Sequence, residues 1–86
     1  MNVAVPSQLR DYTGGHAQVE AHGATLAELL ADLERRYPGM RFRVIDEQDR
    51  IRRHIRIFVN QALAWDLGVA LGANDEVVIV GALSGG

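Results

Sequence analysis

The chain has 86 residues, which is enough for one domain around one modest hydrophobic core. Its formal net charge of -2 excludes the strong basic excess typical of nucleic-acid-binding and membrane-surface proteins, and no apolar run approaches the ~20 residues that span a bilayer. It contains no cysteine, which excludes disulfides, thiolate catalysis and zinc–thiolate sites.

The opening Met1-Asn2-Val3-Ala4-Val5-Pro6 lacks the basic and apolar regions of a signal peptide, so we expect a cytoplasmic protein. Residues 1–5 and 16–22 each place apolar side chains at every second position. This alternation predicts two short strands with one buried face. Thr13-Gly14-Gly15 lies between them and predicts a turn, because glycine tolerates positive φ.

A helix is predicted over residues 25–37. Thr25 is a favourable N-cap, and Glu28 three residues later completes a capping box. One apolar stripe follows at helical spacing, formed by Leu26, Leu29, Leu30 and Leu33. Asp32 and the other acidic residues lie off this stripe, and Pro38-Gly39 ends the helix.

Residues 40–53 are rich in arginine and aspartate and are predicted to be a polar crossover. Ile55, Ile57 and Val59 then fall at every second position, which predicts a third strand. Asn60-Gln61 is a predicted tight turn. The remaining predicted elements are a short strand over residues 62–64, a turn or 3₁₀ segment over 67–71, and a last strand over 76–80.

A single amphipathic helix must cover the apolar face of a sheet if both are to be hidden from water. We therefore predict an α+β fold, the β-grasp, with one helix packed across a mixed sheet of four to five strands. This domain is expected over residues 1–81, with a flexible C-terminal diglycine tail over residues 82–86. The residues predicted to be buried are Val3, Val5, Val19, Leu26, Leu29, Leu30, Leu33, Ile55, Ile57, Val59, Leu71, Val77 and Ile79.

A β-grasp pattern of this length that ends at Gly85-Gly86 resembles the MoaD/ThiS sulfur carriers, which are ubiquitin-like proteins. Leu9-Arg10 and Thr13-Gly14-Gly15 are similar to actinobacterial members that supply cysteine synthesis. The chain departs from many members of the family in two places: Gly81-Ala82 replaces their Pro-Pro pair, and Asn60-Gln61 replaces their Asn-Gly. The other segments that carry the resemblance are Gly23-Ala24-Thr25-Leu26, Ile55-Arg56-Ile57-Phe58-Val59-Asn60 and Asn74-Asp75-Glu76-Val77.

The resemblance implies a carrier protein, not an enzyme, with no bound cofactor or metal. It implies that a ubiquitin-activating-type enzyme uses ATP to adenylate Gly86, which is then converted to a thiocarboxylate. This group would donate sulfur to a biosynthetic enzyme that makes a cofactor or cysteine. Leu83, Ser84 and Gly85 would be recognised with the tail, and glycine at both last positions removes side chains that could clash in a narrow active site.

Three alternative functions share this fold pattern: a small subunit of molybdopterin synthase, a ubiquitin-like protein modifier, and an interaction module with an inert tail. All nine basic residues are arginine. Codon composition is the simpler explanation for the absence of lysine. The functional alternative is that a protein with an activated terminal acyl group benefits from having no lysine amines to attack it.

The last strand also predicts a partner-binding surface. Val77 and Ile79 should face the helix, so Val78 and Val80 should face outward, as should Phe58 in its own strand. An exposed apolar patch of this kind marks a protein interface. A strand register shifted by one residue would instead bury these three side chains.

His16 and His22 lie six residues apart, roughly 20 Å along a strand, which is too far for one metal ion, and with Glu20 they are interpreted as a solvated face. His54 is interpreted as a surface residue. The arginines within residues 41–56 are interpreted as a solvated face with local ion pairs, the alternative being a basic patch that attracts an acidic partner. Trp65 is expected to be partly buried.

Overall fold

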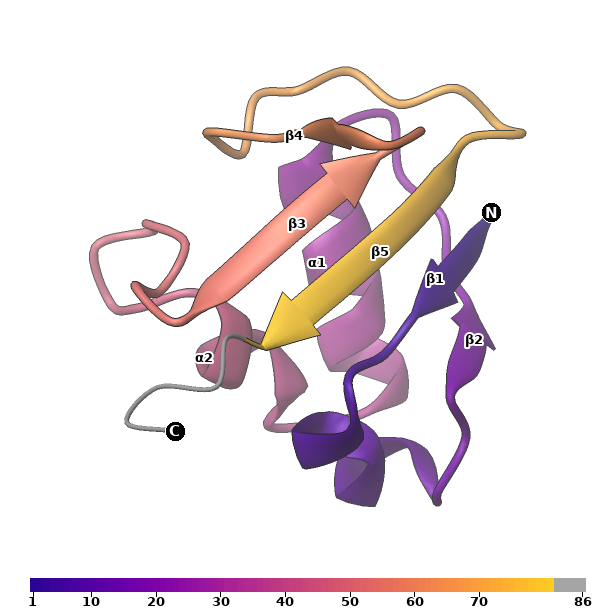
Figure 1. Ribbon diagram of the computed structural model, residues 1–86, viewed down its shortest axis with the longest axis vertical. Coiled ribbons are helices and arrows are strands. Elements are labelled where there is room, and N and C mark those ends of the chain that lie inside the picture. Colours follow the sequence, from indigo (N-terminus) through magenta and orange to yellow (C-terminus); the bar gives the residue numbers. More distant parts are fainter. Residues whose placement is uncertain (82–86) are drawn as a thin grey trace.

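A five-stranded sheet with helices against one face forms the described part of the chain, residues 1–81, in the computed structural model (Figure 1). The predicted α+β β-grasp is confirmed. The strands are β1 (Asn2–Ala4), β2 (Gln18–Glu20), β3 (Ile55–Val59), β4 (Ala62–Leu63) and β5 (Glu76–Gly81). The helices are the 3₁₀ helix η1 (Ser7–Thr13) and the α-helices α1 (Leu26–Arg36) and α2 (Met40–Val44).

The strand order is β2-β1-β5-β3-β4, so the last strand of the described chain lies in the middle of the sheet. β5 pairs with β1 in parallel and with β3 in antiparallel orientation, and the other neighbours are antiparallel. The sheet is therefore mixed, as predicted. α1 crosses one face of this sheet (Figure 1).

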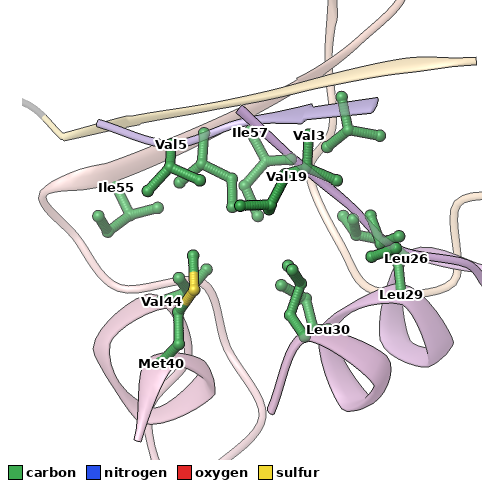
Figure 2. Close-up of a cluster of buried hydrophobic side chains, with 14 of the residues drawn as sticks. Val3, Val5, Val19, Leu26, Leu29, Leu30, Met40, Val44, Ile55 and Ile57 are labelled. Atoms are coloured by element: carbon green, nitrogen blue, oxygen red, sulfur yellow. The ribbon is translucent and has the colours of Figure 1, made fainter. Parts of the chain in front are cut away.

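The core lies between the sheet and the helices (Figure 2). Val3, Val77 and Ile57 on neighbouring strands are buried on the same face, while the leucine stripe of α1 meets them from the other side. Burial of such side chains supplies most of the driving force for folding. Every residue predicted to be buried is buried except Leu71, which is partly buried at the edge of the core.

The helix layer contains more than the one predicted helix. Residues 40–53, predicted to be a polar crossover, begin with α2, and its Met40 and Val44 are fully buried together with Ile45 (Figure 2 shows Met40 and Val44). η1 was also missed, and its Leu9 and Thr13 are buried. Both helices are shorter than two full turns of regular α-helix. Helices this short are unstable on their own in water, so burial of their apolar side chains in the core stabilises them.

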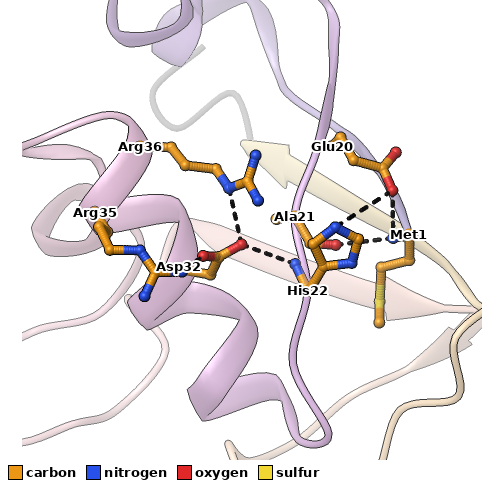
Figure 3. Close-up of polar contacts among 7 residues, drawn as sticks. All are labelled: Met1, Glu20, Ala21, His22, Asp32, Arg35 and Arg36. Atoms are coloured by element: carbon orange, nitrogen blue, oxygen red, sulfur yellow. Dashed lines mark hydrogen bonds and ion pairs between the residues drawn. The ribbon is translucent and has the colours of Figure 1, made fainter.

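Asp32 lies off the leucine stripe, yet it is buried (Figure 3). One of its carboxylate oxygens accepts hydrogen bonds from His22 N and Arg36 Nε, each at 2.9 Å, and the other accepts from Arg35. The bond from His22, followed by the effect of Arg36, lowers the pKa of Asp32. The buried charge is thereby compensated, as buried carboxylates must be.

Candidate functional site

The residues predicted to carry or present the reactive end, Gly86 with Leu83, Ser84 and Gly85, lie outside the described residues, which stop at Gly81. The structure places the strand that leads to them. β5 pairs with β1 over its first half and with β3 along almost its whole length, where Gly81 lies opposite Ile55. Pairing of β5 with strands on both sides therefore fixes the position of Gly81, after which the tail begins.

The predicted partner-binding residues lie together on the outer face of the sheet, opposite the face that α1 and α2 cover. Val78 pairs with Ala4 on one side and with Phe58 on the other, and Phe58 also pairs with Leu63 of β4. Val80 is exposed, while Phe58 and Val78 are half-buried. The predicted outward orientation of Phe58, Val78 and Val80 is confirmed, whereas their role in partner binding stays a prediction.

η1, which sequence analysis missed, borders the end of β5. A Cβ on Gly81 would lie 2.1 Å from Gln8 Nε2 and 2.6 Å from Gln8 Cδ, so the end of the exposed Gln8 side chain lies over Gly81 and would have to move to admit a side chain there. Beside it is an open groove of about 460 Å³ between β1, η1 and β5. Gly81 is also the position where many members of the family carry proline.

Hydrogen bonds between the β3–β4 turn and the loop before β5 fix the start of β5. Asn60 Nδ2 donates to Asp75 Oδ1 at 2.8 Å, and Glu76 N donates to Asn60 Oδ1 at 2.9 Å. Gly72 N donates to Asp75 Oδ2 at 2.7 Å, and this bond, followed by that from Asn60, lowers the pKa of Asp75. These residues of the family pattern therefore position the strand that leads toward Gly86.

Several arginines within residues 41–56 have local partners, as predicted for a solvated face. Arg41 Nη2 lies 3.0 Å from Asp49 Oδ1 in an exposed ion pair. Arg43 Nε donates to Tyr12 Oη at 2.7 Å, which raises the pKa of Arg43. Such exposed pairs contribute little to stability.

Trp65 is 82% exposed, so the expectation that it is partly buried is wrong. It lies two residues after β4, and the intervening Ala64 is buried and donates its N–H to the carbonyl of Ile57 at 2.8 Å. Alternation along this short edge strand therefore turns the next side chain outward. Trp65 lines a groove together with arginines of the segment before β3.

Glu20 and His22 lie beside the chain's first residue and form a small polar cluster (Figure 3). The Met1 amine donates to Glu20 Oε2 and to the carbonyl of Ala21, each at 2.8 Å, and the bond to Glu20 is the main cause of its lowered pKa. His22 Nε2 is 3.9 Å from Glu20 Oε2. Among residues 1–81, no group of three or more His, Asp or Glu side chains is arranged to hold a metal ion, and no helix is long and apolar enough to cross a membrane.

Comparison with known proteins gives consistent similarities over the whole chain. The model of the ThiS family matches residues 3–86. Sulfur carrier protein CysO of Mycobacterium tuberculosis (strain ATCC 25618 / H37Rv) is 34% identical over 91 aligned residues, which cover 100% of this chain and 98% of that protein. Both likenesses extend past Gly81 into the tail.

Solved structures give the same result for the fold. A chain of the Amycolatopsis orientalis BexX/CysO complex has a TM-score of 0.91 at 34% identity, covering 99% of this chain and 98% of that one. SAMP1 from Haloferax volcanii has a TM-score of 0.79 at 28% identity, covering 100% of this chain and 98% of that one.

Proposed function

This chain belongs to the ThiS family, and we propose that it carries sulfur as a thiocarboxylate on Gly86, which donates the sulfur in cysteine or cofactor biosynthesis. The observation that carries the proposal is the full-length likeness to sulfur carrier protein CysO, combined with the Gly85-Gly86 pair that follows β5. The CysO relatives favour cysteine as the product. The protein is a carrier, not an enzyme, and acts as the substrate of its partners.

The proposed chemistry follows from the weak reactivity of a carboxylate. An adenylating enzyme of the ubiquitin-activating type transfers AMP from ATP to the Gly86 carboxylate and releases pyrophosphate. A hydrosulfide sulfur then attacks the acyl carbon, the C–S bond forms, and AMP leaves with the electrons of the broken C–O bond. The chain has no cysteine, so it has no thiol of its own to carry the sulfur.

The outer face of the sheet supports a docking role for Phe58, Val78 and Val80. They form one apolar surface over β5, which leads into the tail, and β3, which pairs with β5 up to Gly81. An apolar surface rimmed by polar residues is typical of protein interfaces. We propose that the adenylating enzyme and the sulfur-accepting enzyme both bind this face while Gly86 enters their active sites.

The test is ATP–pyrophosphate exchange with the adenylating enzyme encoded in the same genome, followed by the intact mass of the product. The native chain should exchange and then gain one sulfur in place of one oxygen. One residue added after Gly86 displaces the carboxylate by over 3 Å, and even 1 Å can cost about 100-fold in rate. Equal activation of native, extended and Gly86-deleted chains would show that the terminal mechanism is wrong.

Replacing Phe58→Asp should weaken binding to the adenylating enzyme by roughly tenfold or more, because a carboxylate would be desolvated at the centre of the interface. Binding is measured by calorimetry, and folding by the thermal midpoint. Ala31→Asp on the exposed side of α1 adds the same charge on the opposite face and should bind like the native chain. Equal affinity of both variants would remove Phe58 from the interface.

A second function, protein modification, is favoured by the 28% identity to Haloferax volcanii SAMP1, the small archaeal modifier protein 1. In that case the activated Gly86 would form isopeptide bonds with lysines of target proteins. Digestion of proteins from the native cell would then yield lysine residues carrying a Gly-Gly remnant. A thiocarboxylate on Gly86 without such remnants assigns the chain to sulfur transfer alone.

A further inference from the structure

A groove of about 240 Å³ opens beside β3, between the segment that precedes this strand and the residues that follow β4. Its floor is apolar and includes Ile55 and Leu63. Its polar rim consists of the three arginines Arg52, Arg53 and Arg56, with Trp65 alongside. None of the described residues that line the groove is acidic.

The arginines of this groove form no close ion pair with an acidic side chain of the described chain. Arg35 and Arg36 are paired with Asp32, and Arg41 with Asp49, but no ion pair within residues 1–81 involves an arginine of the groove. The chain as a whole carries a net charge of -2. Asp46 is the acidic residue that Arg52 acts on: the pKa of Asp46 is lowered first by backbone hydrogen bonds from Arg50 and Gln48 and then by the charges of Arg50 and Arg52. The cluster of three arginines nevertheless stands out against a chain of net negative charge.

Two of the groove arginines are held in place by neutral partners. Arg52 Nε donates to the carbonyl of Phe42 at 2.7 Å, and its guanidinium lies 4.5 Å above the Phe42 ring. Arg56 Nη1 donates to the carbonyls of Arg53 and Ile55 at 2.7 and 3.0 Å. A guanidinium has five donors, so each retains N–H groups for an external acceptor and its orientation is already set.

The groove lies at the same end of the sheet as the start of the tail. Ile55 on its floor pairs with Gly81, and Arg56 on its rim pairs with Val80. A protein that takes up the residues after Gly81 has to cover this end of the molecule. The arginines and Trp65 would then lie at or beside the contact, and Trp and Arg are the residue types most enriched in binding hot spots.

We propose that the groove binds an acidic segment of the enzyme that activates Gly86, with carboxylates paired to Arg52, Arg53 and Arg56 and an apolar side chain packed on Trp65. The inference rests on the proposed function and adds a second contact to the outer-face surface. Carboxylate–guanidinium pairs fit because the groove offers fixed donors and none of the residues that line it is acidic. The charge would also speed encounter at low ionic strength.

The experiment measures the KM of the carrier in ATP–pyrophosphate exchange at low and high salt. The Arg53 side chain is exposed and has no hydrogen bond or ion pair with another described residue, so Arg53→Gln removes its charge without breaking a contact within residues 1–81. We expect the KM of this variant to rise roughly tenfold at low salt with kcat unchanged. The increase should shrink as salt screens the native contact. Trp65→Ala should also raise KM. Arg50→Gln, a neighbouring arginine outside the groove, is the matched control and should leave KM unchanged.

Trp65 is the chain's one tryptophan, so 5-fluorotryptophan labelling gives a single ¹⁹F resonance that reports on the groove directly. Adding the enzyme should shift or broaden it. If deletion of Gly86 abolishes exchange while Arg53→Gln and Trp65→Ala keep the native KM, the groove inference is overturned and the proposed function stands. A native chain that is not activated overturns both. A shift caused by ATP without enzyme would make the groove a nucleotide site and also overturn the inference.

Discussion

Asp32 is a carboxylate buried between α1 and the segment after β2, with donors on both oxygens. Its lowered pKa means that the charged form is favoured in the folded state. The resulting stability is complete above the unfolded-state pKa of about 4 and is lost as the pH falls through the lower folded-state value. Asp32 therefore links the helix layer to the sheet edge most strongly at neutral pH.

Replacing Asp32→Asn should lower the urea midpoint at pH 7, because one acceptor oxygen becomes a donor facing Arg35 or Arg36. The variant should also lose less stability than the native chain between pH 5 and pH 3, since one titrating group is gone. Urea melts at both pH values check this. Asp11→Asn at an exposed position is the control and should follow the native curve. Parallel pH profiles for Asp32→Asn and the native chain would contradict the assignment.

Gly23 is required by close approach of backbone and not by its dihedral angles. A Cβ at this position would lie 2.4 Å from Leu29 N and 2.8 Å from the carbonyl carbon of Glu28, both in the backbone of α1. Gly23→Ala should therefore lower the free energy of unfolding by about 1–3 kcal/mol, the usual cost of overpacking. Gly72→Ala, whose nearest contact would be an ordinary 3.5 Å to Asp75, should cost much less. Chemical denaturation of both variants provides the comparison.

At the scale of elements, the start of α1 depends on the Thr25 cap. Glu28 N donates to Thr25 Oγ1 at 3.2 Å, while Glu28 Oε1 accepts from Ala24 N, one residue earlier than in the standard capping box. Thr25→Ala should lower the free energy of unfolding by about 1 kcal/mol, and Thr25→Ser, which keeps the hydroxyl, should cost little. An unchanged denaturation midpoint for Thr25→Ala would remove this role.

The β3–β4 turn is one of the two places where this chain departs from the family, and both central residues have positive φ, 50° at Asn60 and 72° at Gln61. Glycine adopts such angles without strain, so Gln61→Gly should raise the free energy of unfolding by about 0.5–1 kcal/mol. Asn60→Gly should have the opposite effect, because it removes the hydrogen bonds to Asp75 and Glu76. Thermal melts that move in the same direction for both variants would contradict this account.

The elements that could be predicted from sequence are those whose pattern is local. The leucine stripe of α1 and the alternation of β3 and β5 each fix a buried face within a few residues, which is why the outward direction of Phe58 and Val78 was predictable. α2 was not, because Arg41 and Arg43 lie between Met40 and Val44 and the helix is stabilised by burial of these two side chains in the core.

At the scale of the whole molecule, the features that could not be predicted from sequence are contacts between segments that lie far apart in the chain. Asp32 is buried by its contact with His22, and Gln8 of η1 reaches Gly81 of the last strand. The Trp65 groove combines the residues before β3 with those after β4. No periodicity in one segment encodes such contacts. The Gly85-Gly86 end could be recognised from sequence because the proposed sulfur chemistry depends on these two adjacent residues and on a β-grasp domain before them.

The central place of β5 has a consequence for how the protein comes into being. β5 joins the β2–β1 pair to the β3–β4 pair, which share no strand pairing without it, and it lies closest to Gly86 in sequence. On the ribosome these two halves emerge first and the strand that unites them emerges last, so the sheet closes only near the end of synthesis. A chain that stopped before β5 would lack both the central strand of the sheet and the Gly85-Gly86 end. Under the proposed function, Gly86 is therefore made only on chains that also contain β5, the strand needed to assemble the outer face of the sheet.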